Sequence, residues 1–248
     1  MKLALLSDLH ANRQATEAVW AHAQAQGFDK LVLLGDLVDY GADPAWVLEF
    51  CQAQQGHGAI VIRGNHDDAL RADTTSQMSG HVIPSLEWTK RQLSAVDTHW
   101  LTQLPLTAEL GPCLFAHANT HDPAHWQYLS GRMEAMHSLT VSHAHQYLFC
   151  GHIHYQCLYH LSSTGKTGEF QPVDGVPIAL SRARRWLAIP GSVGQPRDGN
   201  PAACYATFDI DTATLSFFRV PYDHDTAAQR VLAAGLPSAL AQRLIDGR

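Results

Sequence analysis

The chain has 248 residues, 46% of them apolar and 16% charged, a composition typical of a globular protein with a substantial core. The formal net charge of −6 argues against broad electrostatic binding to nucleic acid or to an anionic membrane surface. Five cysteines without a C-x-x-C spacing argue against a disulfide framework, and the first apolar run is too short for a signal-peptide core. No apolar stretch approaches the roughly 20 residues of a membrane span. We therefore expect a cytoplasmic protein that does not enter a membrane, and its oligomeric state is open.

The first 67 residues are predicted to alternate strand and helix. Predicted strands cover residues 2–7, 30–34 and 59–62, and predicted helices cover about 12–26 and 44–54. In the first helix, Ala15, Val19 and Ala23 recur at four-residue spacing. Alternation of this kind indicates a parallel sheet with right-handed crossovers.

The rest of the chain is predicted to add two insertions, a second sheet and a helical tail. Residues 68–105 and 121–146 are polar and mostly helical in pattern, and we expect them to form cap-like insertions over the ligand edge. The second half shows short strands with turns, including a hairpin over about 204–220, and is expected to form a more antiparallel sheet packed on the first. Residues 226–248 are predicted to form two short helices. Without repeats or a low-complexity linker, the whole chain is expected to be one domain, 1–248.

Six short apolar runs are each followed at once by polar residues. The junctions are Ser7–His10, Gly35-Asp36, Arg63–Asp67, His117, Gly151–His154 and Pro190–Ser192. In an open α/β sheet, ligands gather at the carboxyl ends of the strands. Each junction alone has an ordinary explanation, such as an Asp that caps a helix. Together, Asp, His and Asn at this edge are what two divalent cations sharing one carboxylate need.

In this order, the motifs resemble those of the calcineurin-like metallophosphoesterase superfamily, and the resemblance covers about residues 1–222. The stretch Pro190–Gly199 is similar to a signature of the bacterial and archaeal branch of small phosphodiesterases. The resemblance implies an α/β fold of two packed mixed β-sheets flanked by helices, a four-layer α/β/β/α sandwich with helical cap insertions. It also implies a metal-dependent phosphoric ester hydrolase.

The resemblance assigns seven side chains to two metal ions. One ion would be held by Asp8, His10 and His154 and the other by Asn65, His117 and His152, with Asp36 bridging them. Carboxylate, amide and imidazole ligands suit Mn²⁺ best, with Fe²⁺, Zn²⁺, Mg²⁺ and Ni²⁺ as alternatives. A hydroxide bridging the two ions would then attack phosphorus in line.

Two residues beside the ligands are expected to act in catalysis. His66 would donate a proton to the leaving-group oxygen or stabilise its charge, unless it is only a structural histidine. Asp67 would orient the His66 ring and favour its protonated form. The alternative for Asp67 is to cap the helix that follows.

The sequence departs from its relatives in the segment that follows Asp36. Protein phosphatases and symmetrically cleaving dinucleoside-tetraphosphate hydrolases of this superfamily carry an Arg where this chain has Tyr40, and Tyr lacks the bidentate fork that Arg offers a phosphate. Arg197 is a candidate phosphate contact, unless it pairs with Asp198 or another carboxylate. Asn12 is a second candidate substrate contact, and the alternative for Asn12 is an N-cap.

Several aromatic and histidine residues are open to more than one interpretation. Aromatic side chains of the insertions could stack on an aromatic part of a substrate or pack a small core of their own: Trp88, Trp126 and Tyr128. His143 and His145 precede the strand at 147–150, so they are expected at the opposite, solvent edge of the sheet. His121 and His125 follow His117 on the ligand side, and their role is open.

The motifs favour an enzyme that hydrolyses a small phosphate ester by attack of a metal-bridging hydroxide. Phosphodiesters are the expected substrates, and dinucleoside polyphosphates and phosphomonoesters are the alternatives. A binding scaffold with this fold is the competing function. A scaffold need not keep all seven ligands and His66, whereas this chain keeps them all.

Overall fold

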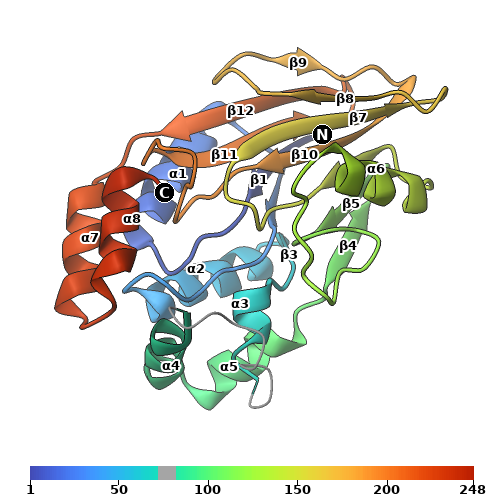
Figure 1. Cartoon of the computed structure of the whole chain (residues 1–248). Helices are drawn as coiled ribbons and strands as arrows, with labels where there is room; N and C mark the ends of the chain where they lie inside the picture. Colours follow the sequence, from blue (N-terminus) through green and yellow to red (C-terminus); the bar gives the residue numbers. More distant parts are fainter. Residues whose placement is uncertain (72–81) are drawn as a thin grey trace.

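The computed structural model describes residues 1–71 and 82–248 and contains two mixed β-sheets of six strands each, flanked by helices (Figure 1). This is the predicted fold class. The first sheet has the order β3-β2-β1-β11-β12-β9. Its strands are β3 (Ile60–Val61), β2 (Lys30–Leu33), β1 (Lys2–Leu6), β11 (Ala203–Asp209), β12 (Thr214–Val220) and β9 (Ile178–Ala179). The three N-terminal strands are parallel, as predicted, and the other three add antiparallel neighbours.

The second sheet has the order β4-β5-β6-β10-β7-β8. Its strands are β4 (Thr107–Leu110), β5 (Cys113–Ala116), β6 (Tyr147–Phe149), β10 (Arg184–Pro190), β7 (Gln156–Ser162) and β8 (Thr167–Phe170). The strands β5, β6 and β10 run parallel to one another. Their carboxyl ends therefore lie at one edge of this sheet.

The prediction that the second half of the chain forms its own sheet is wrong. Strand β11 pairs with β1 in the first sheet, with Leu3 opposite Phe208, while β10 pairs with β6 in the second. Both sheets therefore combine strands from the two halves. The residues of β11 are buried from Ala203 to Phe208, as expected for a strand inside a sheet rather than at its edge.

The layers follow from the alternation of side chains along the strands. Leu3 and Leu5 face the core between the two sheets, whereas Ala4 and Leu6 face the core under the helices α1 and α2. Helix α1 spans Arg13–Gln26 and α2 spans Pro44–Gly56. On the other side, α6 (Arg132–Val141) packs on the second sheet through a third cluster. The order of layers is helix, sheet, sheet, helix.

The remaining described helices lie between β3 and β4 and after β12. They are α3 (Asn65–Asp68), α4 (Val82–Gln92), α5 (Ala95–Gln103), α7 (His224–Ala233) and α8 (Ser238–Asp246). Part of the predicted first insertion, residues 72–81, lies outside the described residues. Figure 1 shows α4 and α5 at the lower edge and α7 and α8 side by side at the left. Among the helices described, none is long and apolar enough to cross a membrane.

Candidate metal centre

The seven predicted ligands come from loops that follow five strands of the two sheets. The loop after β1 carries Asp8 and His10, the loop after β2 carries Asp36, and the turn after β3 carries Asn65. From the second sheet, β5 leads to His117 and β6 leads to His152 and His154. Because these five strands are parallel within their sheets, their carboxyl ends bring the loops together.

The structure gathers six of these side chains into two groups that share Asp36. The four-residue group consists of Asp8, His10, Asp36 and His154, and the three-residue group consists of Asp36, His117 and His152. All six are buried. The seventh side chain joins the second group, because Asn65 Oδ1 lies 3.1 Å from His117 Nε2.

The histidine rings present bare nitrogen atoms to one another. His10 Nε2 lies 3.1 Å from His154 Nε2, and His117 Nε2 lies 3.2 Å from His152 Nδ1. The other nitrogen of each ring faces a backbone carbonyl, of Val38, Gln195, Leu34 and Trp126 respectively. When those nitrogens donate, the facing nitrogens of the neutral rings carry only lone pairs. Such pairs repel unless a cation lies between them, so the donor set fits metal ions.

The charges of the centre also favour a bound cation. Asp36 Oδ2 is buried and lacks a hydrogen-bond partner among the described residues, although His117 Nε2 approaches it to 3.2 Å. Burial lowers and the charge of Asp36 raises the pKa of His117, with a net rise to about 9. Burial and the His117 charge lower the pKa of His152 to about 3. The three-residue group therefore favours a positive charge beside Asp36.

The loops that carry the ligands have strained backbones. Among the described residues, ten other than glycine have a positive φ, and all but Ala213 are site residues or their close neighbours. The nine are Asp8, His10, Ala11, Asp36, Asp39, Tyr40, Trp126, His152 and His154. Left-handed conformations of this kind concentrate at functional sites, where the surrounding structure enforces them.

Two glycines make room for the ligand carboxylates. A Cβ atom at Gly64 would overlap the carboxylate of Asp36, and a Cβ atom at Gly151 would overlap Ser7 Oγ and lie 2.8 Å from Asp8 Oδ2. Neither position can carry a larger residue without moving a ligand. This explains why glycine precedes Asn65 and His152 in their motifs.

The predicted partner of His66 is wrong, because Asp39 takes the place expected for Asp67. His66 Nδ1 lies 2.7 Å from Asp39 Oδ2, and both side chains are buried. Burial lowers the pKa of His66, but the charge of Asp36 and the contact with Asp39 outweigh burial and raise it. The protonated ring is thereby favoured. The sequence signal for Asp39 is its position three residues after Asp36, in the segment Gly35–Gly41.

Asp67 instead holds two backbone segments together. Its Oδ1 accepts hydrogen bonds from the amides of Leu37 (2.9 Å) and Val38 (3.3 Å), and its Oδ2 accepts one from Gly64 at 2.9 Å. Burial and the charge of Asp36 raise its pKa to about 7. The helix-cap interpretation therefore describes Asp67, which also ties the loop after Asp36 to α3.

Arg197 lies beside the centre without a carboxylate partner among the described residues. Its Nη2 donates to Gln195 Oε1 at 2.9 Å, and its guanidinium lies 5.9 Å from the ring centre of Tyr40. The alternative pairing with Asp198 is wrong, because Asp198 binds Arg219 through both carboxylate oxygens. Arg197 is thus available to an anion.

Tyr40 packs against two histidines of the centre. Its ring lies 4.6 Å from that of His10 and 4.5 Å from that of His66, and 7% of its surface is exposed. Burial raises its pKa, so the hydroxyl stays neutral. Tyr40 packs the two histidines in place and offers Arg197 an aromatic face.

The structure assigns Asn12 a structural role rather than a substrate contact. Asn12 Oδ1 accepts from the amide of Ala15 at 3.1 Å and so caps α1. Its Nδ2 donates to the carbonyl of Gly194 at 2.8 Å and to the hydroxyl of Tyr222 at 3.1 Å. Both ends of the amide are therefore engaged, and the side chain is 3% exposed.

The sequence leaves the roles of three aromatic residues open. Two of them lie at the site, and the third packs in a separate cluster. Trp88 packs with the C-terminal helices. By contrast, the ring of Trp126 lies 6.0 Å from that of His117, and the ring of Tyr128 stacks on His152 at 4.1 Å. Trp126 and Tyr128 therefore border the three-residue group, and Trp88 does not belong to it.

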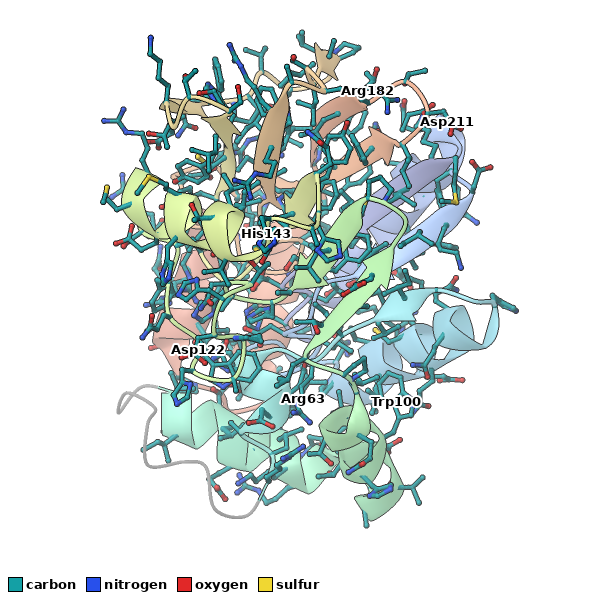
Figure 2. All side chains as sticks on the ribbon, turned by 90° about the vertical axis from the view of Figure 1, so that its right-hand side faces the viewer. Arg63, Trp100, Asp122, His143, Arg182 and Asp211 are labelled. Carbon is teal, nitrogen blue, oxygen red and sulfur yellow. The ribbon has the colours of Figure 1, made fainter. Side chains whose placement is uncertain are left out.

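The four other histidines named above lie outside both ligand groups. His143 is exposed and lies on the surface that faces the viewer in Figure 2, and His145 lies 3.3 Å from Glu109. Both agree with the predicted solvent edge. His121 contacts Ser138 Oγ at 3.0 Å, and His125 contacts the carboxylate of Asp122, also labelled in Figure 2.

A sandwich of two mixed sheets around a buried Asp/His centre is the architecture of metallophosphoesterases. The sequence profile of the calcineurin-like phosphoesterase superfamily domain matches residues 1–213, and the chain belongs to this superfamily, as predicted. The family is metal-dependent, and membership supports phosphoester hydrolase activity.

Sequence and structure comparisons find relatives along the whole chain. The chain is 30% identical to an uncharacterised protein of Methanocaldococcus jannaschii, over 99% of this chain and 98% of the relative. It is 26% identical to the phosphodiesterase YfcE of Escherichia coli, over 87% of this chain and 91% of YfcE.

Among solved structures, a metallophosphoesterase from Sphaerobacter thermophilus matches with a TM-score of 0.85 and 31% identity, over 100% of this chain and 99% of that chain. A hypothetical protein from Pyrococcus horikoshii matches with a TM-score of 0.79 and 18% identity, over 100% of this chain and 98% of that chain. This second likeness concerns the fold alone.

Proposed function

We propose that the protein is a two-metal phosphoesterase that hydrolyses a phosphodiester or a related small phosphate ester. The observation that supports this most strongly is the pairwise approach of four imidazoles around the buried Asp36 Oδ2, which lacks a hydrogen-bond partner among the described residues. A scaffold gains nothing from such an arrangement, because buried polar atoms without partners destabilise a fold. The named activity of YfcE as a phosphodiesterase supports diesters as the first class of substrate to test, ahead of dinucleoside polyphosphates and phosphomonoesters.

The seven side chains would divide between two divalent ions. One ion would be held by Asp8, His10 and His154 and the other by Asn65, His117 and His152, with Asp36 shared. Two such ions, when bound, would neutralise phosphate oxygens and lower the pKa of a nearby water. Oxygen and imidazole donors together favour Mn²⁺ in this role, with Fe²⁺, Zn²⁺, Mg²⁺ and Ni²⁺ as alternatives.

The protein's own groups would handle the leaving group and the phosphate charge. Asp39 fixes His66 through Nδ1, so the Nε2 atom of the protonated ring is the one free to donate to the departing ester oxygen. Water supplies hydroxide to phosphorus and releases its other proton to solvent, one P–O ester bond breaks, and the leaving alcohol takes the proton from His66. His66 is then protonated again from solvent. Arg197 would contact the phosphate from the Tyr40 side of the site, where its guanidinium lies.

The test is the turnover of bis-p-nitrophenyl phosphate and p-nitrophenyl phosphate by metal-stripped protein titrated with Mn²⁺. We expect hydrolysis that appears only as Mn²⁺ is restored and that is faster for the diester. The Asp36→Asn variant serves as the matched control, because it keeps the shape of the shared ligand and removes its charge. Folded, Mn²⁺-loaded protein that hydrolyses neither ester would contradict the proposal and favour the scaffold.

A further inference from the structure

The segment that follows His117 carries an exposed aromatic ring at the metal centre. We call residues Asn119–Leu129 the aromatic strap. Tyr128 in this strap stacks on His152 with ring centres 4.1 Å apart and planes 16° apart, yet 55% of its surface is exposed. Among the described residues, His152 is its one ring contact and no group hydrogen-bonds its hydroxyl. One face of the ring is thus covered by a predicted metal ligand, and the rest is open.

The position of Tyr128 is fixed by its neighbours along the strap. The buried side chain of Asn119 donates to the carbonyl of Gln127 at 3.2 Å and accepts from the amide of Asp122 at 2.7 Å. On the other side of Tyr128, Leu129 is fully buried in the core under α6. The position of the ring is therefore set by the hydrogen bonds of Asn119 to the backbone of the strap and by the burial of Leu129, and not by the Tyr128 hydroxyl.

Trp126 adds a second link between the strap and the centre. Its φ of 55° is unusual for a bulky residue, and its carbonyl oxygen lies 3.0 Å from His152 Nε2. The strained turn thus orients the ring of His152 from one side while Tyr128 covers its face. The strap is built onto the ligand group and is not a loose surface loop.

From this geometry, we infer that Tyr128 forms a subsite for a planar aromatic substituent of the phosphate ester. The inference rests on the proposed function. Stacking on a pre-positioned aromatic face contributes affinity without a large ordering cost. The ring of an aryl ester is joined to phosphorus through one oxygen atom, so it lies just beyond the phosphate that the centre would bind.

The same geometry indicates which ester substituent meets Tyr128. His66 packs against His10, a member of the four-residue group, with ring centres 5.1 Å apart. Tyr128 packs against His152, a member of the three-residue group. The leaving alcohol departs toward His66, so the substituent on Tyr128 is the one that stays on the monoester product.

The test measures binding directly, with ligands that cannot be hydrolysed. Benzylphosphonate places a ring one atom from phosphorus, as in an aryl ester, and ethylphosphonate lacks the ring. Calorimetry on Mn²⁺-loaded protein gives the ratio of the two Kd values for wild type and for Tyr128→Leu, Tyr128→Phe and Phe170→Leu. Phe170 lies on β8 and is 45% exposed, so it controls for loss of any exposed aromatic residue.

We expect wild type to bind benzylphosphonate about 3- to 10-fold more tightly than ethylphosphonate, the range that one stacked pair supplies. Tyr128→Leu should bring the ratio close to one, with the metal content unchanged. Tyr128→Phe and Phe170→Leu should keep the wild-type ratio. A wild-type ratio near one, or a Tyr128→Leu variant that keeps the wild-type ratio, would overturn the inference. So would an equal weakening of both ligands together with metal loss, because Tyr128 would then serve only to shield His152.

Turnover separates this inference from the proposed function. Protein that prefers benzylphosphonate but hydrolyses no ester would retain the subsite and refute the phosphoesterase. Protein that hydrolyses diesters but shows no preference would retain the phosphoesterase and refute the subsite.

Discussion

Replacing Asp39 with Asn isolates one interaction of the centre, the 2.7 Å contact between Asp39 Oδ2 and His66 Nδ1. The substitution keeps the size of the side chain and its ability to accept a hydrogen bond, but it removes the charge. A hydrogen bond to a charged group contributes about 1.5–3 kcal/mol and a neutral one about 1 kcal/mol. The protonated form of His66 therefore loses about 1–2 kcal/mol of stabilisation, which corresponds to a rate loss of roughly 5- to 30-fold wherever that proton is needed.

The loss should depend on the leaving group and on pH. Alkyl diesters have basic leaving groups that need the proton of His66, so they should slow by the full amount, whereas p-nitrophenyl esters should slow less. Asp39 is among the groups that raise the pKa of His66. Without its charge the pKa falls, so the protonated form is lost at lower pH and the alkaline limb of the kcat profile moves toward acid. The assay is kcat against pH for one alkyl and one aryl diester.

Asp67→Asn is the matched control, because Asp67 is the other buried carboxylate near His66. Its oxygens accept from backbone amides, so this variant should lose about 1–3 kcal/mol of stability and keep the wild-type leaving-group dependence. If Asp67→Asn moved the alkaline limb and Asp39→Asn did not, the assignment of Asp39 as the partner of His66 would be refuted.

Three further substitutions test other parts of the structure. Asp36→Asn should lower turnover more than about 100-fold and reduce bound Mn²⁺ measured by atomic emission, because changes even to outer partners of metal ligands cost about 10- to 100-fold. Gly151→Ala should destabilise the protein by about 1–3 kcal/mol in urea and weaken Mn²⁺ binding, since the new methyl displaces Asp8; unchanged Mn²⁺ affinity would argue against this displacement. Asn12→Ala should cost about 1–3 kcal/mol in urea through the lost cap and the unpaired Gly194 carbonyl, with Mn²⁺ affinity retained.

The clustering of the candidate ligands could be anticipated from the sequence because the signal for each strand end is local. Each apolar run is continuous, as in a strand buried on both faces. The end of the strand is marked by the change from apolar to polar residues. The predicted strand at 30–34 covers β2, and the predicted start of the first helix coincides with the cap at Asn12. Once the strand ends are known, the rule for parallel sheets brings the six junctions to one edge.

The partner of His66 could not be read from adjacency in the chain. Asn65–Asp68 form a single helical turn, and neighbouring side chains on a helix point in different directions. Asp67 therefore turns toward the backbone of the loop after Asp36, while Asp39 reaches His66 from that loop. The pairing of β11 with β1 cannot be predicted for a related reason, because burial identifies an interior strand but not its neighbour.

The backbone carbonyls that orient the histidines also cannot be identified from the sequence. Any residue type supplies a carbonyl, so nothing about Leu34 or Val38 predicts a contact with a ring. What fixes these contacts is the left-handed conformation of the loops, including Asp36 and Asp39. Each such residue costs on the order of 1 kcal/mol, and the cost recurs in the loops after β1, β2 and β6. Local preferences disfavour these loops, so the packed sheets on either side must enforce them. A cation at the centre would separate the facing imidazole lone pairs, so the loops that the sheets enforce bring together a set of side chains that could hold metal ions.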